Sequence, residues 1–118
     1  MAQTLEQQRA AYAWKCVNEV RPQEREEYKN LAKAMPMMVM NSGLMQTLAF
    51  LEEKNKAHHT ALRDHVIHWI TKQGQGERPM PFAQLMPELL KAGPVRFRQF
   101  TAETHAILRW IRQLASAV

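Results

Sequence analysis

The chain has 118 residues, 46% of them hydrophobic and 23% charged, with a formal net charge of +5 and a sequence pI near 9.7. This length suits one domain whose core needs no disulfide, and the composition is ordinary for a globular protein. Cys16 is the single cysteine, so an internal disulfide is excluded. We expect Cys16 to be a small buried hydrophobic residue rather than a reactive thiol.

The sequence has no basic-then-apolar leader and no apolar run near the ~20 residues of a membrane span. We therefore expect a soluble, cytoplasmic protein without a membrane partner. Its positive charge favours polyanions, among which nucleic acid is the commonest inside a cell.

Apolar residues recur at helical spacing along the chain, and no alternating strand pattern of useful length occurs. Thr4 and Gln7 match a capping box, which predicts a first helix over residues 4–20. Pro22 suits the first turn of a second helix, which should kink or break at Pro36 because proline removes an amide donor.

Asn41-Ser42-Gly43 predicts a helix end or hinge, and a further helical segment follows it. Another helix is expected near residues 58–72, then a Gly- and Pro-rich loop at 73–81, and a helix from about residue 82 to 90. The last helix is expected from an N-cap at Thr101 to Ala117. The pattern predicts an all-α fold: a single compact bundle of about five to seven helices over residues 1–118.

Four of the five histidines fall within residues 58–68. His65 and His68 lie one turn apart, but zinc needs three or four converging ligands, and the helical two-histidine signature with an intervening glutamate is absent. Glu103 and His105 resemble an acid–base pair, although exposed helix-end residues explain them more simply. We predict no metal site and no cofactor.

No sequence motif of a hydrolytic nucleophile or of a phosphate-binding loop is present. Acid–base catalysis needs positioned partners with tuned pKa values, and the sequence offers no such pair. We therefore predict a protein that is not an enzyme and has no catalytic residues.

Basic residues recur at helical spacing on two segments. Arg21, Arg25, Lys29 and Lys33 follow one flank of the second helix, whereas Arg109 and Arg112 form a narrower stripe with His105 on the last helix. Such stripes can follow a phosphate backbone without reading bases.

Several large apolar residues fall outside the predicted core faces. Trp14 and Trp110 lie off the main apolar face of their helices, and Met37 and Met40 point outward from the second helix. Because tryptophan is enriched at protein interfaces, Met37, Met40 and Trp110 are our candidates for subunit contact.

Three blocks of sequence carry a family resemblance: Glu27–Lys33 (EYKNLAK) leading to Pro36, Asn41-x-Gly43-Leu44 with Gln46–Leu51 (QTLAFL), and Thr101–Glu103 with Leu108–Arg112 (LRWIR). With these blocks the chain resembles the small α-helical subunit of the Cmr complex, the type III-B CRISPR-associated RNA-guided effector. The resemblance runs over nearly the whole chain, although residues 57–92 match mainly in helical character.

The resemblance implies a non-catalytic subunit that stacks in several copies beside the backbone subunits and contacts guide and target RNA through basic surface. The implied partners are the backbone and large Cmr subunits, further copies of the chain, guide RNA and target RNA. Our candidate RNA contacts are Arg25, Lys29, Lys33, Arg109 and Arg112, with Arg9, Lys15 and Arg21 as weaker candidates.

Two alternatives remain open at this stage. A free-standing helical DNA-binding regulator would use residues 41–43 as its turn and Gln46, Thr47 and Phe50 on its recognition helix. A helical nuclease or metal protein would be built on His65 and His68.

Overall fold

The first helix forms where the local sequence predicts it. The computed structural model describes residues 2–118, in which α1 spans Leu5–Glu19. Thr4 caps it through a reciprocal capping box with Gln7: the Gln7 amide donates to Thr4 Oγ1 at 3.1 Å, and the Thr4 amide donates to Gln7 Oε1 at 2.8 Å. Pro22 then opens a short 3₁₀ turn, η1, over Pro22–Glu24.

The long helix α2, Arg25–Lys54, leaves helical backbone angles at Gly43, where it kinks, and stays helical at Pro36. Gly43 has φ 85° and ψ 164°, a conformation open almost only to glycine, whereas Pro36 lies inside the helix. The predicted hinge at residues 41–43 is confirmed. Of the predicted kink or break at Pro36, the break is wrong, because the backbone stays helical there. Met35 and Val39 are buried on either side of Pro36, so their packing holds the backbone helical despite the missing hydrogen bond.

The remaining helices are α3, Ala57–Lys72, α4, Phe82–Lys91, and α5, Pro94–Ala117. The predicted loop at 73–81 connects α3 to α4. The predicted start of the last helix at Thr101 is wrong, because Pro94 follows Gly93 at the first helical position. Thr101 lies inside α5, where its hydroxyl donates to the Phe97 carbonyl at 3.2 Å.

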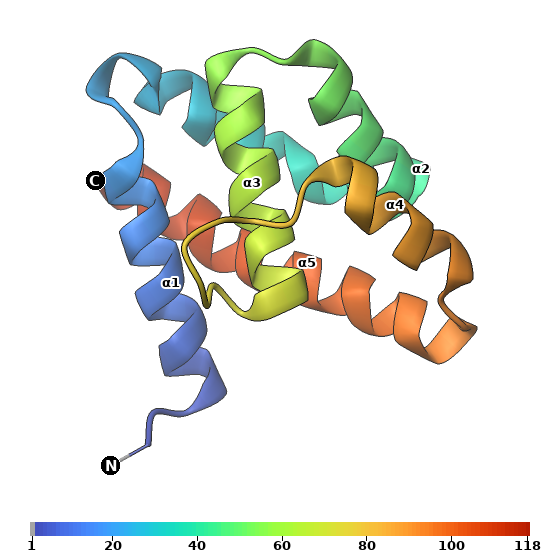
Figure 1. The fold of residues 1–118 in the computed structure, drawn as a ribbon. Coiled ribbons are helices and arrows are strands. Elements are labelled where there is room, and N and C mark those ends of the chain that lie inside the picture. The colour runs from blue at the N-terminus through green and yellow to red at the C-terminus, as the bar shows by residue number, and fades with distance from the viewer. Residues whose placement is uncertain (1) are drawn as a thin grey trace.

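The bundle is arranged around α3, which Figure 1 shows between α1 on one side and the second half of α2 on the other. The run Val66–Ile70 of α3 is buried without a gap, as expected for a helix covered on every side. The all-α bundle with a kinked long helix is therefore confirmed. Among residues 2–118, no helix is both long enough and apolar enough to cross a membrane.

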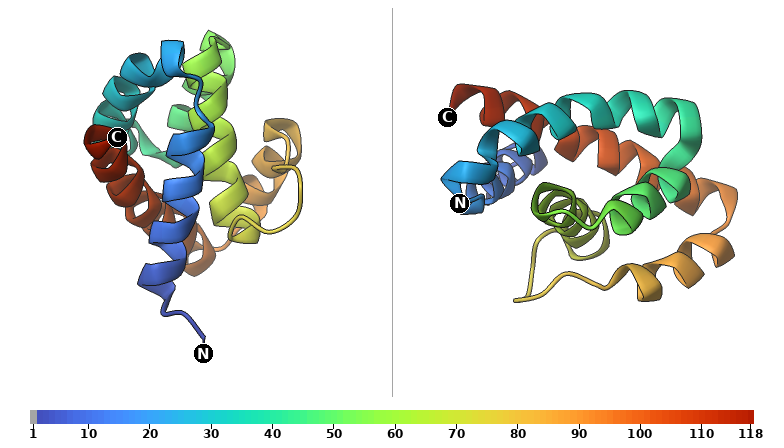
Figure 2. Two further views of the ribbon diagram at one scale, coloured as in Figure 1. Left: turned by 90° about the vertical axis from the view of Figure 1, so that its left-hand side faces the viewer. Right: turned by 90° about the horizontal axis from the view of Figure 1, so that it is seen from above.

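The first half of α2 lies against α5 and runs in the opposite direction, which Figure 2 shows most clearly from above. This pairing brings together two segments that are far apart in the sequence, and both carry predicted basic stripes. Because of this pairing, basic residues of α2 and α5 can contact the same ligand.

Candidate nucleic-acid interface

A shallow groove of about 390 Å³ runs between α2 and α5. Pro36 and Met40 line it from α2, and His105, Arg109 and Arg112 line it from α5. Pro36 contributes a ring and no amide hydrogen, so this wall of the groove is apolar. The groove therefore has one apolar wall and one basic wall, a combination suited to a polyanion that also offers flat apolar surfaces.

Lys33 extends the basic character of this groove toward the start of α2. It is exposed and lies one turn before Pro36 and two turns before Met40, on the same side of the helix. Within residues 2–118, no carboxylate oxygen lies within the 4.0 Å of an ion pair from Lys33, Arg109 or Arg112. We call Lys33, His105, Arg109 and Arg112 the basic groove.

Lys29 and Arg25 lie on the same helix but are held by their neighbours. Lys29 Nζ is 2.9 Å from a Glu26 carboxylate oxygen, and the lysine side chain is only about one quarter exposed, at 26%. Arg25 is half-buried, and its Nε donates to the Val20 carbonyl at 3.0 Å. Arg25 thus ties the end of α1 to the start of α2.

Arg9 is the candidate most deeply engaged within the fold. Its Nε and one terminal nitrogen each lie 2.8 Å from a Glu103 oxygen, so α1 and α5 are joined by a two-point ion pair. The hydrogen bond to Glu103 raises the pKa of the Arg9 guanidinium above its ordinary value. The same hydrogen bond, seen from the other partner, lowers the pKa of the Glu103 carboxyl, and the buried Trp69 indole adds to this by donating at 2.6 Å.

The other two weaker candidates lie on the α1 side of the bundle. Lys15 is exposed and lies 3.9 Å from a Glu19 oxygen, and Arg21 is exposed just before η1. The structure therefore divides the eight predicted cations. Arg109 and Arg112 line one groove, Lys33 lies one helical turn before its Pro36 wall, and the other five lie elsewhere or are engaged by their neighbours.

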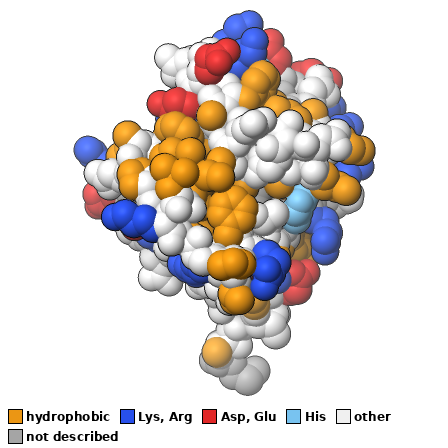
Figure 3. Space-filling view, turned by 90° about the vertical axis from the view of Figure 1, so that its right-hand side faces the viewer, with side chains coloured by type: hydrophobic (Ala, Val, Ile, Leu, Met, Phe, Trp, Pro, Cys, Tyr) orange, Lys and Arg blue, Asp and Glu red, His pale blue; other side chains and the backbone are white. Residues whose placement is uncertain are grey.

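The predicted subunit contacts differ in exposure. Met37 and Met40 are 59% and 71% exposed, whereas Trp110 packs partly against the core and donates from its indole to Glu6 at 3.1 Å. Figure 3 shows hydrophobic side chains gathered on one face of the molecule, with Lys and Arg side chains at the margin. Helices α2, α4 and α5 reach that side in Figure 1. Leu90 of α4 and Val95 of α5 are also exposed.

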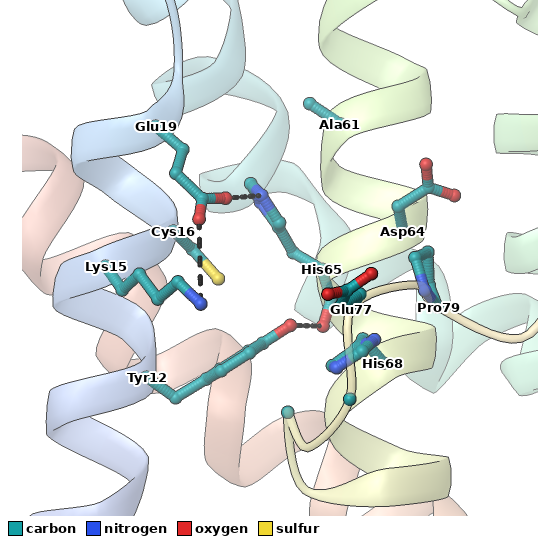
Figure 4. Close-up of a pocket in the computed structure, with 12 residues that line it drawn as sticks. Tyr12, Lys15, Cys16, Glu19, Ala61, Asp64, His65, His68, Glu77 and Pro79 are labelled. Carbon is teal, nitrogen blue, oxygen red and sulfur yellow. Dashed lines mark hydrogen bonds and ion pairs between the residues drawn. The ribbon is translucent and has the colours of Figure 1, made fainter.

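A second pocket, of about 250 Å³, lies between α1, α3 and the 73–81 loop (Figure 4). Several of its polar groups are engaged within the fold: the Tyr12 hydroxyl donates to the His65 carbonyl at 2.6 Å, and His65 Nε2 is 3.5 Å from a Glu19 oxygen. Cys16 is buried there as expected, and burial raises the pKa of its thiol to about 12, so it stays protonated at neutral pH.

The two histidines of the metal-protein alternative are held by aromatic residues. The Tyr28 hydroxyl lies 2.8 Å from His65 Nδ1, and His68 is buried with its ring parallel to that of Tyr12. Among residues 2–118, neither histidine joins a third donor at metal-binding spacing. Glu103 is not free to act with His105 as an acid–base pair either, because Arg9 and Trp69 occupy its carboxylate.

Two features of the site could not be predicted from the sequence pattern. The pattern at Pro36 indicates only a break, and nothing in it shows that the ring would line a groove with the last helix. The Glu103–Arg9 pair also has no local signal, because the two residues lie 94 positions apart in the sequence.

The chain is similar to known proteins over most of its length. The chain matches the family described as CRISPR-associated protein (Cas_Cmr5) over residues 5–118. One relative, the CRISPR system Cmr subunit Cmr5 of Thermus thermophilus, is 29% identical over 94 residues, which are 80% of this chain and 76% of that protein. The crystal structure of a Cmr5 family protein from the same organism superposes with a TM-score of 0.81 at 26% identity, covering 98% of this chain and 97% of the other.

The family match extends over almost the entire chain, and the structural match covers all five helices. Both agree with the resemblance drawn from the three sequence blocks, which is thereby confirmed. The chain belongs to the Cmr5 family of CRISPR-associated proteins.

Proposed function

We propose that the chain is the non-catalytic small subunit of a type III-B CRISPR effector ribonucleoprotein, which works in antiviral defence in the cytoplasm. The relative from Thermus thermophilus is a Cmr subunit by name, and the family match extends this assignment to the present chain. The partners are the backbone and large subunits of the complex, further copies of the chain, guide RNA and target RNA.

The observation that carries the RNA role is the basic groove between α2 and α5. Lys33, Arg109 and Arg112 have no carboxylate within ion-pair distance in the described residues 2–118, so they can neutralise phosphates without giving up an internal partner. Such contacts release counterions and read no base, which makes the affinity sensitive to salt and independent of sequence. Arg9, Arg25 and Lys29 contribute less, because each already has a partner within the fold.

Met37 and Met40 support stacking of copies beside the groove. Both side chains are more than half exposed, and methionine adapts well to the irregular surface of a neighbouring subunit. Trp110 contributes the edge of its ring, since its indole nitrogen is bonded to Glu6. Several copies in a row would join their grooves into one surface, and multivalency would then make up for the weak binding of a single copy.

The burial of Thr47 argues against a free-standing DNA-binding regulator. A recognition helix following the turn at residues 41–43 would have to expose this residue to base edges. Thr47 is instead buried, and its hydroxyl donates to the Gly43 carbonyl at 2.8 Å.

The test is target-RNA binding by a complex reassembled with variant chains. Lys33→Glu combined with Arg112→Glu should weaken binding and make the negative slope of log K against log salt shallower by about 0.9 for each lost phosphate contact. The matched control is Lys56→Glu with Arg78→Glu, which changes the net charge equally at exposed positions outside the helices. Equal RNA affinity and equal salt slope for the two double variants would refute the role of the groove.

A further inference from the structure

We propose that Glu24, Glu27 and His58 form a binding site for a divalent transition-metal ion of the zinc class. One potential ligand atom of each residue lies within 4.8 Å of the other two. Glu24 comes from η1, Glu27 from the first turn of α2, and His58 from the first turn of α3. The site would therefore link η1 and the start of α2 to the start of α3.

The distances fit an ion placed between the three side chains. His58 Nδ1 is 2.9 Å from a Glu27 oxygen and 4.0 Å from a Glu24 oxygen. Two ligands about 2.0–2.1 Å from a tetrahedral zinc ion stand roughly 3.3 Å apart. The observed separations lie on both sides of this value, so small rotations of the carboxylates would bring all three ligands into range.

The orientation of the His58 ring adds an independent observation. Nδ1 is shielded from solvent, and although the Glu27 oxygen is close, it lies outside the direction in which a ring N–H would donate, so the nitrogen has no hydrogen-bond partner. The in-plane direction of Nδ1 is the one along which a neutral imidazole binds a metal ion.

The donor set selects the class of ion. Zinc accepts both imidazole nitrogen and carboxylate oxygen as ligands, and a zinc site with three protein ligands keeps a fourth position for water. Magnesium and calcium prefer oxygen ligands alone, so the histidine disfavours both. The His58 and Glu24 side chains are 13% and 24% exposed and Glu27 is 62% exposed, which leaves the fourth position open on the Glu27 side.

This site differs from the metal-protein alternative raised by the sequence. That alternative was built on His65 and His68, whereas the present ligands lie near positions 24–27 and 58 and meet only through the packing of α2 on α3. The proposal does not depend on the RNA groove, which lies between α2 and α5.

The test is zinc titration of the chelator-treated full chain by calorimetry, with thermal melting in zinc and in chelator. We expect one zinc ion per chain, an affinity at least about tenfold lower in His58→Gln and in Glu27→Gln, and a zinc-dependent rise in Tm that both variants lose. Glu26→Gln and His105→Gln are the matched controls, because they remove a neighbouring carboxylate and a histidine outside the site, and they should bind zinc like the unmodified chain. Glu27 is mostly exposed, so its variant keeps the test valid if His58→Gln does not fold.

Three results would overturn the proposal. The first is the absence of zinc binding, and the second is unchanged zinc affinity in Glu27→Gln, which would place the ion at other side chains. The third is displacement of zinc by an equal concentration of magnesium, which would mean that the carboxylates act without the imidazole.

Discussion

Removal of the Glu103 carboxylate should destabilise the fold strongly, although its side chain is partly exposed. Glu103 accepts from the Trp69 indole at 2.6 Å and from Arg9 at two points, both at 2.8 Å. Trp69 is 1% exposed, so Glu103→Ala leaves a buried N–H without its partner, at a cost of about 1–3 kcal/mol. Removing one partner costs about 0.2–1 kcal/mol in an exposed ion pair and about 3–5 kcal/mol in a buried one, so we expect about 1–2 kcal/mol for this half-buried pair.

The expected free energy of unfolding of Glu103→Ala is therefore lower by about 3 kcal/mol, which is a fall in Tm of roughly 10 °C for a chain of this size. Glu103→Gln keeps an acceptor for Trp69 and should lose only the ion-pair part. The assay is denaturant unfolding followed by circular dichroism, with Glu88→Gln as the control at an exposed carboxylate. If all three variants unfold within about 0.5 kcal/mol of one another, the network adds no stability and the reasoning fails.

The same network predicts how stability changes with pH. The pKa of Glu103 is lowered in the folded chain, mainly by its hydrogen bond to Arg9. A carboxyl with a lowered folded-state pKa contributes stability above its ordinary pKa, near 4.5, and loses that contribution as the pH falls through this value toward the lowered one. The difference in stability between the unmodified chain and Glu103→Gln should therefore shrink in this acidic range, and a constant difference from neutral to acidic pH would contradict the ion pair.

Three further predictions concern the hinge, the loop and the buried histidine. Gly43→Ala meets no atom within 4 Å but must adopt φ 85°, so it should lose about 1–3 kcal/mol of unfolding free energy through backbone strain alone, as measured by denaturant titration. Gly74→Ala would place its Cβ 2.5 Å from Tyr12 Cδ1, so it should destabilise the chain and speed proteolysis of the loop more than the control Gly76→Ala, which has a similar φ and open space. Burial lowers the pKa of His65, so the stability held by the neutral ring is present above pH 6.5 and falls as the pH drops through 6.5, and His65→Gln should flatten this part of the stability–pH curve.

Features with short-range causes could be predicted from the sequence. The capping box of Thr4 and Gln7, the hinge at Gly43 and the loop at 73–81 each depend on residues within a few positions, and all three are confirmed. The break at Pro36 could not be judged locally, since burial of Met35 and Val39 outweighs the hydrogen bond that proline removes.

The predicted start of the last helix at Thr101 was wrong for a related reason. Threonine is a good N-cap, but it is also tolerated inside a helix when its hydroxyl bonds the carbonyl four residues earlier, as Thr101 does with Phe97. The pattern alone does not choose between Thr101 and the Gly93-Pro94 start. The additional turns matter for the site, because they bring Glu103 from the first turn to the middle of α5, opposite Arg9 and Trp69.

For the candidate site too, the sequence predicts the local features, whereas the contacts between helices depend on packing. Sequence spacing predicts that Lys33 and Arg112 each belong to a basic stripe, but only the packing of α2 on α5 makes the two stripes neighbours. Packing also removes Arg9 from the pool of available cations, since a guanidinium that contacts a carboxylate at 2.8 Å must give up that partner before it can neutralise a phosphate.

Cations of equal formal charge therefore have separable roles in this chain. Replacing Arg9 should lower the stability of the isolated chain, whereas replacing Arg112, which has no described carboxylate partner, should leave that stability nearly unchanged and act only when RNA is present. The sequence contains sixteen lysines and arginines, and its net charge alone cannot sort them into these two groups. The carboxylate partners do sort them. A basic side chain that is paired with a carboxylate stabilises the fold, and one without such a partner remains available to bind a ligand.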